Sequence, residues 1–206
     1  MQITAAIFDV GSVLLAWSPQ ALYRRHFPKL SQSEIEAFLR EVDFAEWNLQ
    51  QDRGRPFSEG VAELSERFPH RSPLIRAYHE HWADSILGPI PGTIEIARAL
   101  KKDGLGIYAL TNFSAETFAV ARKAYPFFAE FDDIVVSGEV GIVKPDPEIF
   151  DLTLKRIGCP APECVFIDDA PKNIEVARHL GFAAIQFQDA VQLEHDLRSM
   201  GLMQPH

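Results

Sequence analysis

The sequence predicts an α/β fold: a doubly wound, Rossmann-like parallel five-stranded sheet, with an all-helical region inserted after the first strand. Short apolar runs recur along the chain and alternate with stretches of helical periodicity, which is typical of a parallel sheet flanked by helices. None of the runs alternates apolar with polar residues, as expected for strands buried on both faces. The alternation is interrupted once, between about residues 19 and 87, where only helical patterns occur.

Five strands are predicted from the apolar runs. The first, Ile3–Phe8, is short and closely followed by Gly11, and both features favour a buried strand over a helix. In a doubly wound sheet the chain builds outward from this strand on one side and then crosses to the other. The first and fourth strands should therefore be neighbours. The remaining predicted strands are Gly106–Leu110, Ile134–Val136, Cys164–Ile167 and Ala183–Phe187.

Helices are predicted between these strands from their periodicity and their terminal residues. Pro147–Ile157 has a strong start signal, because Asp146 can cap its N-terminus and proline suits the first helical position. Lys172–Leu180 is expected to end at Gly181, since glycine favours helix C-termini. The other predicted helices of this part of the chain are Thr93–Lys102 and Ser114–Ala124.

The segment that interrupts the alternation has no convincing strand. We therefore predict two domains: an α/β core of residues 1–16 and 88–206, and a helical domain of residues 17–87. Gly88–Gly92 contains two prolines and is predicted to be the hinge between them, and the tail after Leu197 is predicted to be short and irregular. The helices predicted in the interrupting segment are Gln20–Phe27, Ser31–Phe44, Ser58–Phe68 and Leu74–Ser85.

Composition restricts the partners and the compartment. The 206 residues carry a formal net charge of −9, and an acidic surface repels phosphate backbones, so nucleic acid is not an expected partner. No apolar stretch approaches the roughly 20 residues that span a bilayer, and no secretory signal is present. Cys159 and Cys164 lack a spacing typical of zinc sites or disulfide frameworks. These features favour a cytoplasmic protein with no membrane partner. Its expected state, which composition does not determine, is a monomer or a homodimer.

Polar residues follow the predicted strands, at the edge where open parallel sheets bind ligands. A carboxylate at such a position can attack phosphorus and form an acyl-phosphate. A hard, oxygen-ligated cation such as Mg²⁺ would relieve the repulsion between the carboxylate and the phosphate, and a lysine would add a second positive charge. The polar residues at these positions are Asp9, Thr111, Asn112, Lys144, Asp168 and Asp169.

Four segments resemble, in order, the four motifs of the haloacid dehalogenase superfamily. Ala6–Leu14 resembles the first motif and Leu110–Asn112 the second. Lys144–Pro147 resembles the third motif, and Phe166–Asn173 the fourth. Each motif is weak alone, but their order and their positions after strands make the resemblance specific over nearly the full chain. The helical segment resembles the cap that this family inserts after the first strand.

The resemblance implies a magnesium-dependent phosphatase that acts on a small phosphorylated molecule. Asp9 would be the nucleophile and, with the backbone carbonyl of Gly11 and the carboxylate of Asp169, a metal ligand. The implied sites are Asp9 and Lys144 for catalysis; Val10, Gly11, Thr111, Asn112 and Lys144 for phosphate; and Asp9, Gly11, Asp168 and Asp169 for Mg²⁺.

Gly11 departs from the family pattern. Most phosphatases of the family have an aspartate at this position, two residues after the nucleophile, where it acts as general acid and base. Such proton transfer contributes about 10²–10⁴-fold to the rate. A subgroup of sugar-phosphate phosphatases has Asp-x-Gly-Asn-Val at this motif, which resembles Asp9-Val10-Gly11-Ser12-Val13 of this chain except for the serine, and this makes a sugar phosphate a candidate substrate. A leaving group of low pKa would need less protonation. Alternatively, a water molecule or a residue of the cap could supply the proton.

Two other functions remain open, and both follow from Gly11. A metal-independent 2-haloacid dehalogenase needs no general acid, and its family pattern includes a cap arginine at a spacing close to that of Arg40. Dehalogenases of the family lack an adjacent pair of aspartates, so Asp168–Asp169 favours metal and phosphate. A catalytically silent binding module is the second alternative. In the cap, Trp47 and Arg53 are candidates for substrate contact.

Overall fold

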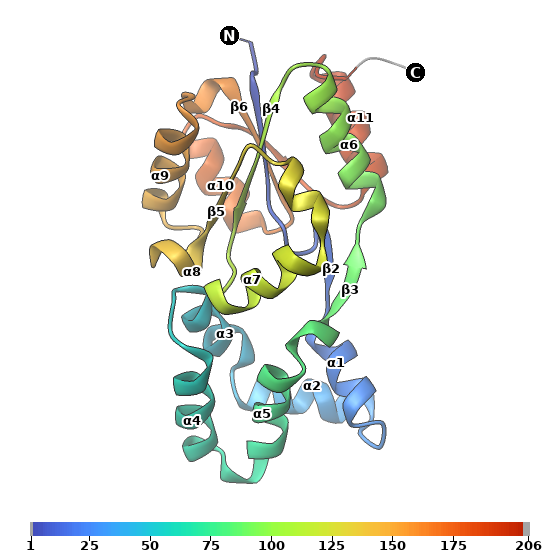
Figure 1. Ribbon diagram of the computed structural model, residues 1–206, viewed down its shortest axis with the longest axis vertical. Coiled ribbons are helices and arrows are strands. Elements are labelled where there is room, and N and C mark those ends of the chain that lie inside the picture. Colours follow the sequence, from blue (N-terminus) through green and yellow to red (C-terminus); the bar gives the residue numbers. More distant parts are fainter. Residues whose placement is uncertain (1, 204–206) are drawn as a thin grey trace.

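The computed structural model describes residues 2–203. Five strands form one parallel sheet in the order β5-β4-β1-β6-β7 (Figure 1). The central strand β1 (Ala5–Phe8) pairs in parallel with β4 (Gly106–Thr111) and with β6 (Cys164–Asp168). β5 (Asp133–Val136) and β7 (Ala183–Gln186) form the edges. The predicted five-stranded sheet is confirmed, and so is the pairing of the first strand with the fourth predicted strand, β6.

Two hydrophobic clusters, one on each face of the sheet, explain why the strands show no polar alternation. Along β1, Ala6 and Phe8 belong to one cluster, and Ala5 and Ile7 belong to the other. Neighbouring residues of a strand point to opposite faces, and here both faces are covered by helices. All residues of β1 and β6 are buried as a result, so the ends of these strands are held in a rigid frame.

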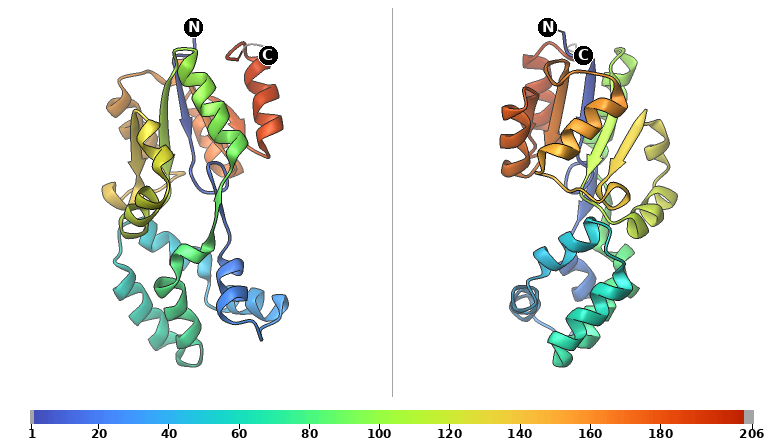
Figure 2. Two further views of the ribbon diagram at one scale, coloured as in Figure 1. Left: turned by 45° about the vertical axis from the view of Figure 1, so that its right-hand side comes forward. Right: turned by 90° about the vertical axis from the view of Figure 1, so that its left-hand side faces the viewer.

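Helices cover the sheet on both sides, as a doubly wound fold requires. Residues of α6 (Pro91–Lys102), α7 (Ala115–Ala124) and α11 (Ala190–Ser199) belong to the first cluster. Residues of α9 (Pro147–Ile157) and α10 (Pro171–His179) belong to the second. Figures 1 and 2 show these helices around the sheet, with both chain ends at the edge opposite the helical insert.

The capping residues account for several helix boundaries. The side chain of Asp146 accepts a hydrogen bond from the Glu148 backbone N–H at 3.0 Å, which confirms the predicted start of α9. For α10 the prediction was wrong by one residue at each end, because the helix begins at Pro171 and ends before Leu180. Leu180 is the C-cap residue, and Gly181, with a φ of 92°, follows it.

Five α-helices lie together beyond the carboxyl ends of the strands (Figures 1 and 2), and residues 18–85, which contain them, are called the helical insert. A two-stranded antiparallel ribbon, β2 (Leu15–Trp17) and β3 (Ile86–Pro89), connects the insert to the sheet. The expectation of no strand in this region was wrong, because β3 begins at Ile86. The hinge at Gly88–Gly92 stays a prediction. The helices of the insert are α1 (Pro19–His26), α2 (Gln32–Glu41), α3 (Phe44–Asp52), α4 (Phe57–Arg67) and α5 (Ser72–Glu80).

Several other predicted boundaries were also wrong. The expected helix Ser31–Phe44 is two helices, because Asp43 has a left-handed conformation with a φ of 47° and separates α2 from α3. The expected helix Leu74–Ser85 becomes a 3-10 turn at Trp82. The tail after Leu197 stays helical to Ser199, where α11 ends. The division into two domains at residues 16/17 and 87/88 stays a prediction.

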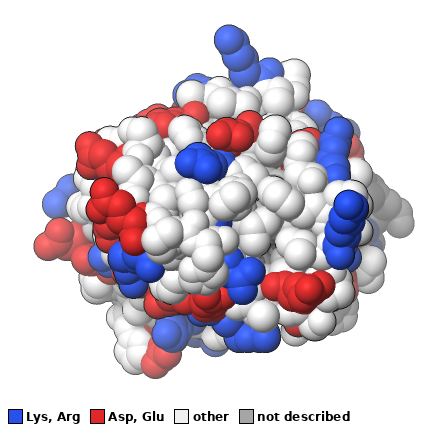
Figure 3. Space-filling view, turned by 90° about the horizontal axis from the view of Figure 1, so that it is seen from below, with Lys and Arg blue, Asp and Glu red and all other residues white. Residues whose placement is uncertain are grey.

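The face of the insert that points away from the sheet carries charges of both signs. Figure 3 shows lysine and arginine side chains interspersed with aspartate and glutamate around an uncharged centre. Charges of one sign do not gather on this face, so it would not steer a highly charged partner toward itself. Within residues 2–203, no helix combines the length and the apolar character needed to cross a membrane.

Candidate active site

The carboxyl ends of three neighbouring strands bring the predicted site residues together. Asp9 directly follows β1, Thr111 is the last residue of β4, and Asp168 is the last residue of β6. β1 is paired in parallel with both other strands, so their ends meet at one edge, where ligands bind in sheets of this type. Lys144 reaches the same edge from the loop between α8 (Ser137–Val140) and α9.

Lys144 is the buried cation of the site. Its Nζ lies 2.9 Å from Asp9 Oδ1 and 2.6 Å from Asp168 Oδ2, and the lysine is only 2% exposed. Burial disfavours its charge, but the two carboxylates outweigh this cost and hold the pKa of Lys144 above its ordinary value. The side chain is therefore a fixed positive charge between the ends of β1 and β6.

Asn112 fixes the backbone of the Lys144 loop. Its Nδ2 donates to the Lys144 carbonyl at 2.9 Å, and its Oδ1 accepts from the Lys144 backbone N–H at 2.8 Å. Asn112 was predicted to contact phosphate, and its side chain also holds the lysine in place. The sequence reasoning did not identify this second role.

Asp168 is fully buried and saturated with donors. Besides Lys144, it accepts from the Ala170 backbone N–H at 2.8 Å and from the Asn173 side chain at 3.0 Å on each carboxylate oxygen. Asn173 was not among the predicted site residues, and its only signal was its position within the fourth motif. Asp169 is exposed, so it is the member of the pair that is open to a ligand.

The residues present fit a hard cation. Ligand oxygens of Asp9, Asp168 and Asp169 lie within 4.8 Å of one another. Burial raises the pKa of Asp9 to about 7, against the opposing effect of Lys144, and the charge of Asp168 adds to the rise. Burial and Asp168 also raise the pKa of Asp169. Both shifts come first from burial and then from neighbouring carboxylates, and a divalent cation with oxygen ligands would stabilise the charged forms.

The loop after β1 turns sharply around Gly11. The Val10 carbonyl accepts from the backbone N–H groups of Leu14 and Leu15 at 2.9 and 2.8 Å. Ser12 has a left-handed conformation with a φ of 59°. A Cβ atom built on Gly11 would have no heavy atom within 4 Å, so the backbone leaves open space where a side chain would begin.

Thr111 contributes a buried hydroxyl without a protein partner. The residue is fully buried, and its Oγ1 has no hydrogen-bond partner among residues 2–203. An unpaired buried hydroxyl costs free energy, so its presence is explained if a phosphate oxygen accepts from it. Thr111 itself does not belong to the pocket wall described next.

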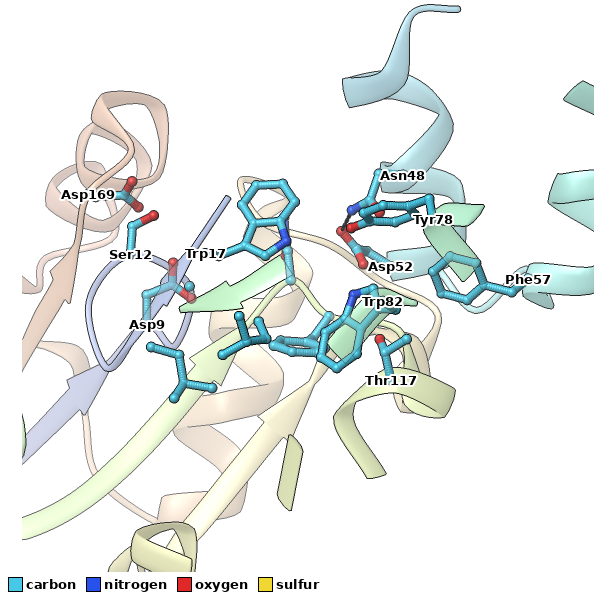
Figure 4. A pocket seen from close by; sticks show the side chains of 15 residues that line it. Asp9, Ser12, Trp17, Asn48, Asp52, Phe57, Tyr78, Trp82, Thr117 and Asp169 are labelled. Carbon is cyan, nitrogen blue, oxygen red and sulfur yellow. Dashed lines mark hydrogen bonds between the residues drawn. The ribbon is translucent and has the colours of Figure 1, made fainter. Parts of the chain in front are cut away.

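A pocket of about 220 Å³ lies between the sheet edge and the insert (Figure 4). One end holds the acidic residues Asp9 and Asp169, and the opposite end holds Asn48 and Asp52 beside the aromatic side chains of Tyr78 and Phe57 (Figure 4). Val10, Lys144 and Asp168 are buried outside its wall. The lining residues are Asp9, Gly11, Ser12, Leu15, Trp17, Asn48, Asp52, Phe57, Tyr78, Trp82, Ile86, Asn112, Phe113, Thr117 and Asp169.

The expected substrate contacts from the insert were wrong. Trp47 packs inside the insert, where its indole N–H donates to the Gly60 carbonyl at 2.9 Å, and Arg53 is absent from the pocket wall. Asn48 and Asp52, on another face of the same helix, line the pocket instead. Their i, i+4 spacing is a signal that sequence reasoning could have used.

Comparison with known proteins agrees with the motifs. A family model described as haloacid dehalogenase-like hydrolase matches residues 3–181. A sesquiterpene phosphatase of Aspergillus oryzae is 28% identical over 203 residues, which are 95% of this chain and 95% of that protein. The chain spans only 18% to 37% of the length of four further curated relatives.

Solved structures share the fold. A HAD family enzyme of Bacteroides thetaiotaomicron in complex with magnesium and inorganic phosphate has a TM-score of 0.68 and 22% identity, covering 91% of this chain and 95% of that one. An L-2-haloacid dehalogenase of Xanthobacter autotrophicus has a TM-score of 0.61 and 18% identity, covering 99% and 85%. At such identities the likeness establishes the fold, and the chemistry has to be argued from the site.

Proposed function

Since the chain belongs to the family of haloacid dehalogenase-like hydrolases, we propose that it is a magnesium-dependent phosphatase of a small phosphorylated metabolite. The observation that carries the proposal is the cluster of Asp9, Asp168 and Asp169, whose ligand oxygens lie within 4.8 Å of one another, with Lys144 bound to two of them. A haloacid substrate would need no such concentration of negative charge.

The metal would be held by the carboxylates of Asp9 and Asp169 and the backbone carbonyl of Gly11, with Asp168 beside them. When bound, Mg²⁺ supplies the positive charge that lets a carboxylate approach a phosphate. The relative crystallised with magnesium and inorganic phosphate supports this assignment.

Asp9 acts as the nucleophile. Its Oδ1 accepts from the Val10 backbone N–H at 2.7 Å and from Lys144 Nζ at 2.9 Å, which leaves Oδ2 as the attacking atom. Attack on phosphorus breaks the bond to the leaving oxygen and forms an aspartyl-phosphate. Water then attacks the same phosphorus, and the Asp9 carboxylate and inorganic phosphate are released. Lys144 and the hydroxyl of Thr111 stabilise the negative charge of the transferring group.

The helical insert acts as a cap that limits the substrate to small molecules. The pocket is lined both by the sheet edge and by residues of the insert such as Tyr78 and Trp82, so a bound substrate would be enclosed between the two parts. Its aromatic wall suits a sugar ring or an apolar group, and sugar phosphates are among the first compounds to test. We further propose that the protein works in the cytoplasm, as a monomer or a homodimer, without a nucleic-acid or membrane partner.

Arg40 argues against the dehalogenase alternative. This arginine, the candidate for the family's haloacid-binding residue, is exposed and does not line the pocket. Among residues 2–203, the pocket wall contains no lysine and no arginine, so the only cationic side chain near a haloacid bound at Asp9 would be the buried Lys144, which Asp9 and Asp168 already hold. No arginine would be available to bind the carboxylate of this substrate.

Metal removal tests the proposal. The protein with MgCl₂ is expected to release phosphate from p-nitrophenyl phosphate, because only a loaded site offsets the repulsion between Asp9 and the phosphate. EDTA should reduce the rate to background, and added Mg²⁺ should restore it. Chloride release from 2-chloropropionate in EDTA, without phosphatase activity in Mg²⁺, would favour the dehalogenase. Activity with neither substrate class, including a panel of sugar phosphates, would favour the silent binding module.

A further inference from the structure

The proton donor that is missing at Gly11 has a candidate replacement across the pocket. Protonation of the leaving oxygen contributes about 10²–10⁴-fold to phosphomonoester hydrolysis when the leaving group is poor. Figure 4 shows Asp52, the last residue of α3, at the end of the pocket opposite Asp9 and Asp169. A substrate phosphate near Asp9 would direct its leaving group into the space between them.

The position of Asp52 is set by contacts with the α/β core. Its backbone carbonyl accepts from Ser137 Oγ at 2.6 Å, and the same Oγ accepts from the Phe113 backbone N–H at 2.9 Å. The chain then turns at Gly54, which has a φ of 100° and whose added Cβ would lie 3.2 Å from the Gly138 carbonyl oxygen. The end of α3 therefore rests directly on the turns that follow β4 and β5.

The surroundings of Asp52 suit a carboxyl group that exchanges a proton. The side chain is partly buried, and Asn48 Nδ2 donates to its Oδ2 at 3.0 Å. Within the described chain, no lysine, arginine or histidine forms an ion pair with it. Burial raises the pKa of Asp52 to about 7, although the Ser114 backbone N–H and Asn48 oppose the rise, and the charge of Asp9 adds to it. Both protonation states are therefore accessible near neutral pH.

We propose that Asp52 is the general acid and base of the reaction, in place of the carboxylate absent at position 11. The inference rests on the proposed phosphatase function. As Asp9 Oδ2 bonds to phosphorus and the phosphorus–oxygen bond to the leaving group breaks, the Asp52 carboxyl proton passes to the leaving oxygen, directly or through one water. The Asp52 carboxylate then takes a proton from the water whose oxygen attacks phosphorus, and the bond from phosphorus to Asp9 breaks. Asp52 is protonated again at the end of the cycle.

The test compares leaving groups in Asp52→Asn. Asparagine keeps the shape and the contact with Asn48 but cannot donate an acidic proton. With an alkyl phosphate, whose leaving oxygen must be protonated, the single-turnover rate of aspartyl-phosphate formation should fall by about 10²–10⁴-fold. With p-nitrophenyl phosphate, whose leaving group departs as an anion, the rate of this first step should fall less than tenfold, whereas the later hydrolysis of the aspartyl-phosphate should slow equally for both substrates. Glu46→Gln is the matched control, because Glu46 is an exposed carboxylate on the same helix and outside the pocket wall.

A second variant separates proton transfer from a merely structural role. A Cβ atom added at position 11 meets no heavy atom within 4 Å. Gly11→Asp in the Asp52→Asn background should therefore raise the alkyl phosphatase activity at least tenfold above that of Asp52→Asn alone. Equal losses in the rate of aspartyl-phosphate formation for alkyl and aryl substrates, with no recovery by Gly11→Asp, would overturn the role of Asp52 while the proposed function stands. A wild-type protein without Mg²⁺-dependent phosphatase activity on any substrate would overturn both. Thermal unfolding of each variant checks that it is folded.

Discussion

Replacing Asp9 by asparagine is expected to abolish turnover, with a fall in kcat of about 10⁴-fold or more. Asparagine has nearly the same shape as aspartate, so its side-chain oxygen can still accept hydrogen bonds from the Val10 backbone N–H and from Lys144. An amide, however, cannot attack phosphorus. The rate of phosphate release from p-nitrophenyl phosphate in saturating Mg²⁺ measures the effect. Acid-quenched samples analysed by mass spectrometry should show a phosphorylated wild-type protein and no phosphorylated variant.

The same substitution should change the pH dependence of stability. In the metal-free protein, burial raises the pKa of Asp9 from 3.8 to about 7. A carboxyl group with a raised pKa in the folded state contributes stability below its unfolded pKa, and this contribution is lost as the pH rises through the folded value. The difference in unfolding midpoint, Asp9→Asn minus wild type, should therefore increase as the pH is raised from about 4 to about 7.

The exposed Asp103, which follows α6, offers a matched control. Asp103→Asn should change neither the rate nor this pH dependence. Retention of more than a tenth of the wild-type rate in Asp9→Asn would rule out Asp9 as the nucleophile. A stability difference that does not change with pH would instead contradict the raised pKa, and the two results are independent of each other.

The sheet and the acidic end of the site could be predicted because local sequence determines them. Asp9 and Asp168 follow apolar runs that are too short for helices, and in a parallel sheet the ends of such runs meet at one edge. The assignment therefore needed only the strand order, which a doubly wound fold restricts. Lys144 was predicted from its motif, although its burial between two carboxylates depends on the fold.

The far end of the pocket could not be predicted in the same way. Which face of α3 meets the sheet edge depends on how the insert is docked, and the local pattern pointed to Trp47 and Arg53 instead of Asp52. The break between α2 and α3 at Asp43 has no glycine or proline to mark it. β2 and β3 are too short to show a period, and they exist because they pair with each other. Tertiary contacts decided each of these features.

Replacing Lys144 by methionine is expected to lower both activity and stability. Methionine has a similar length and no charge, so Asp9 and Asp168 would lose the cation that lies 2.9 and 2.6 Å away. Removing one partner of a buried ion pair costs about 3–5 kcal/mol, measured here by urea unfolding at pH 8. Loss of one charged group that stabilises a transition state costs about 10²–10³-fold in kcat. The exposed Lys172, on α10, provides the control Lys172→Met.

A double variant distinguishes the two effects of Lys144. Lys144→Met alone leaves the carboxylates of Asp9 and Asp168 without their cation. Adding Asp168→Asn removes one of these two charges, and the side-chain carbonyl oxygen of Asn173 can accept a hydrogen bond from the new amide. Stability should recover by at least half of the loss, because less uncompensated charge remains buried. Activity should stay low, because no positive side chain faces the transferring phosphate. Recovery of both would mean that Lys144 acts only by holding the fold together, whereas full activity in the single variant would exclude it from catalysis altogether.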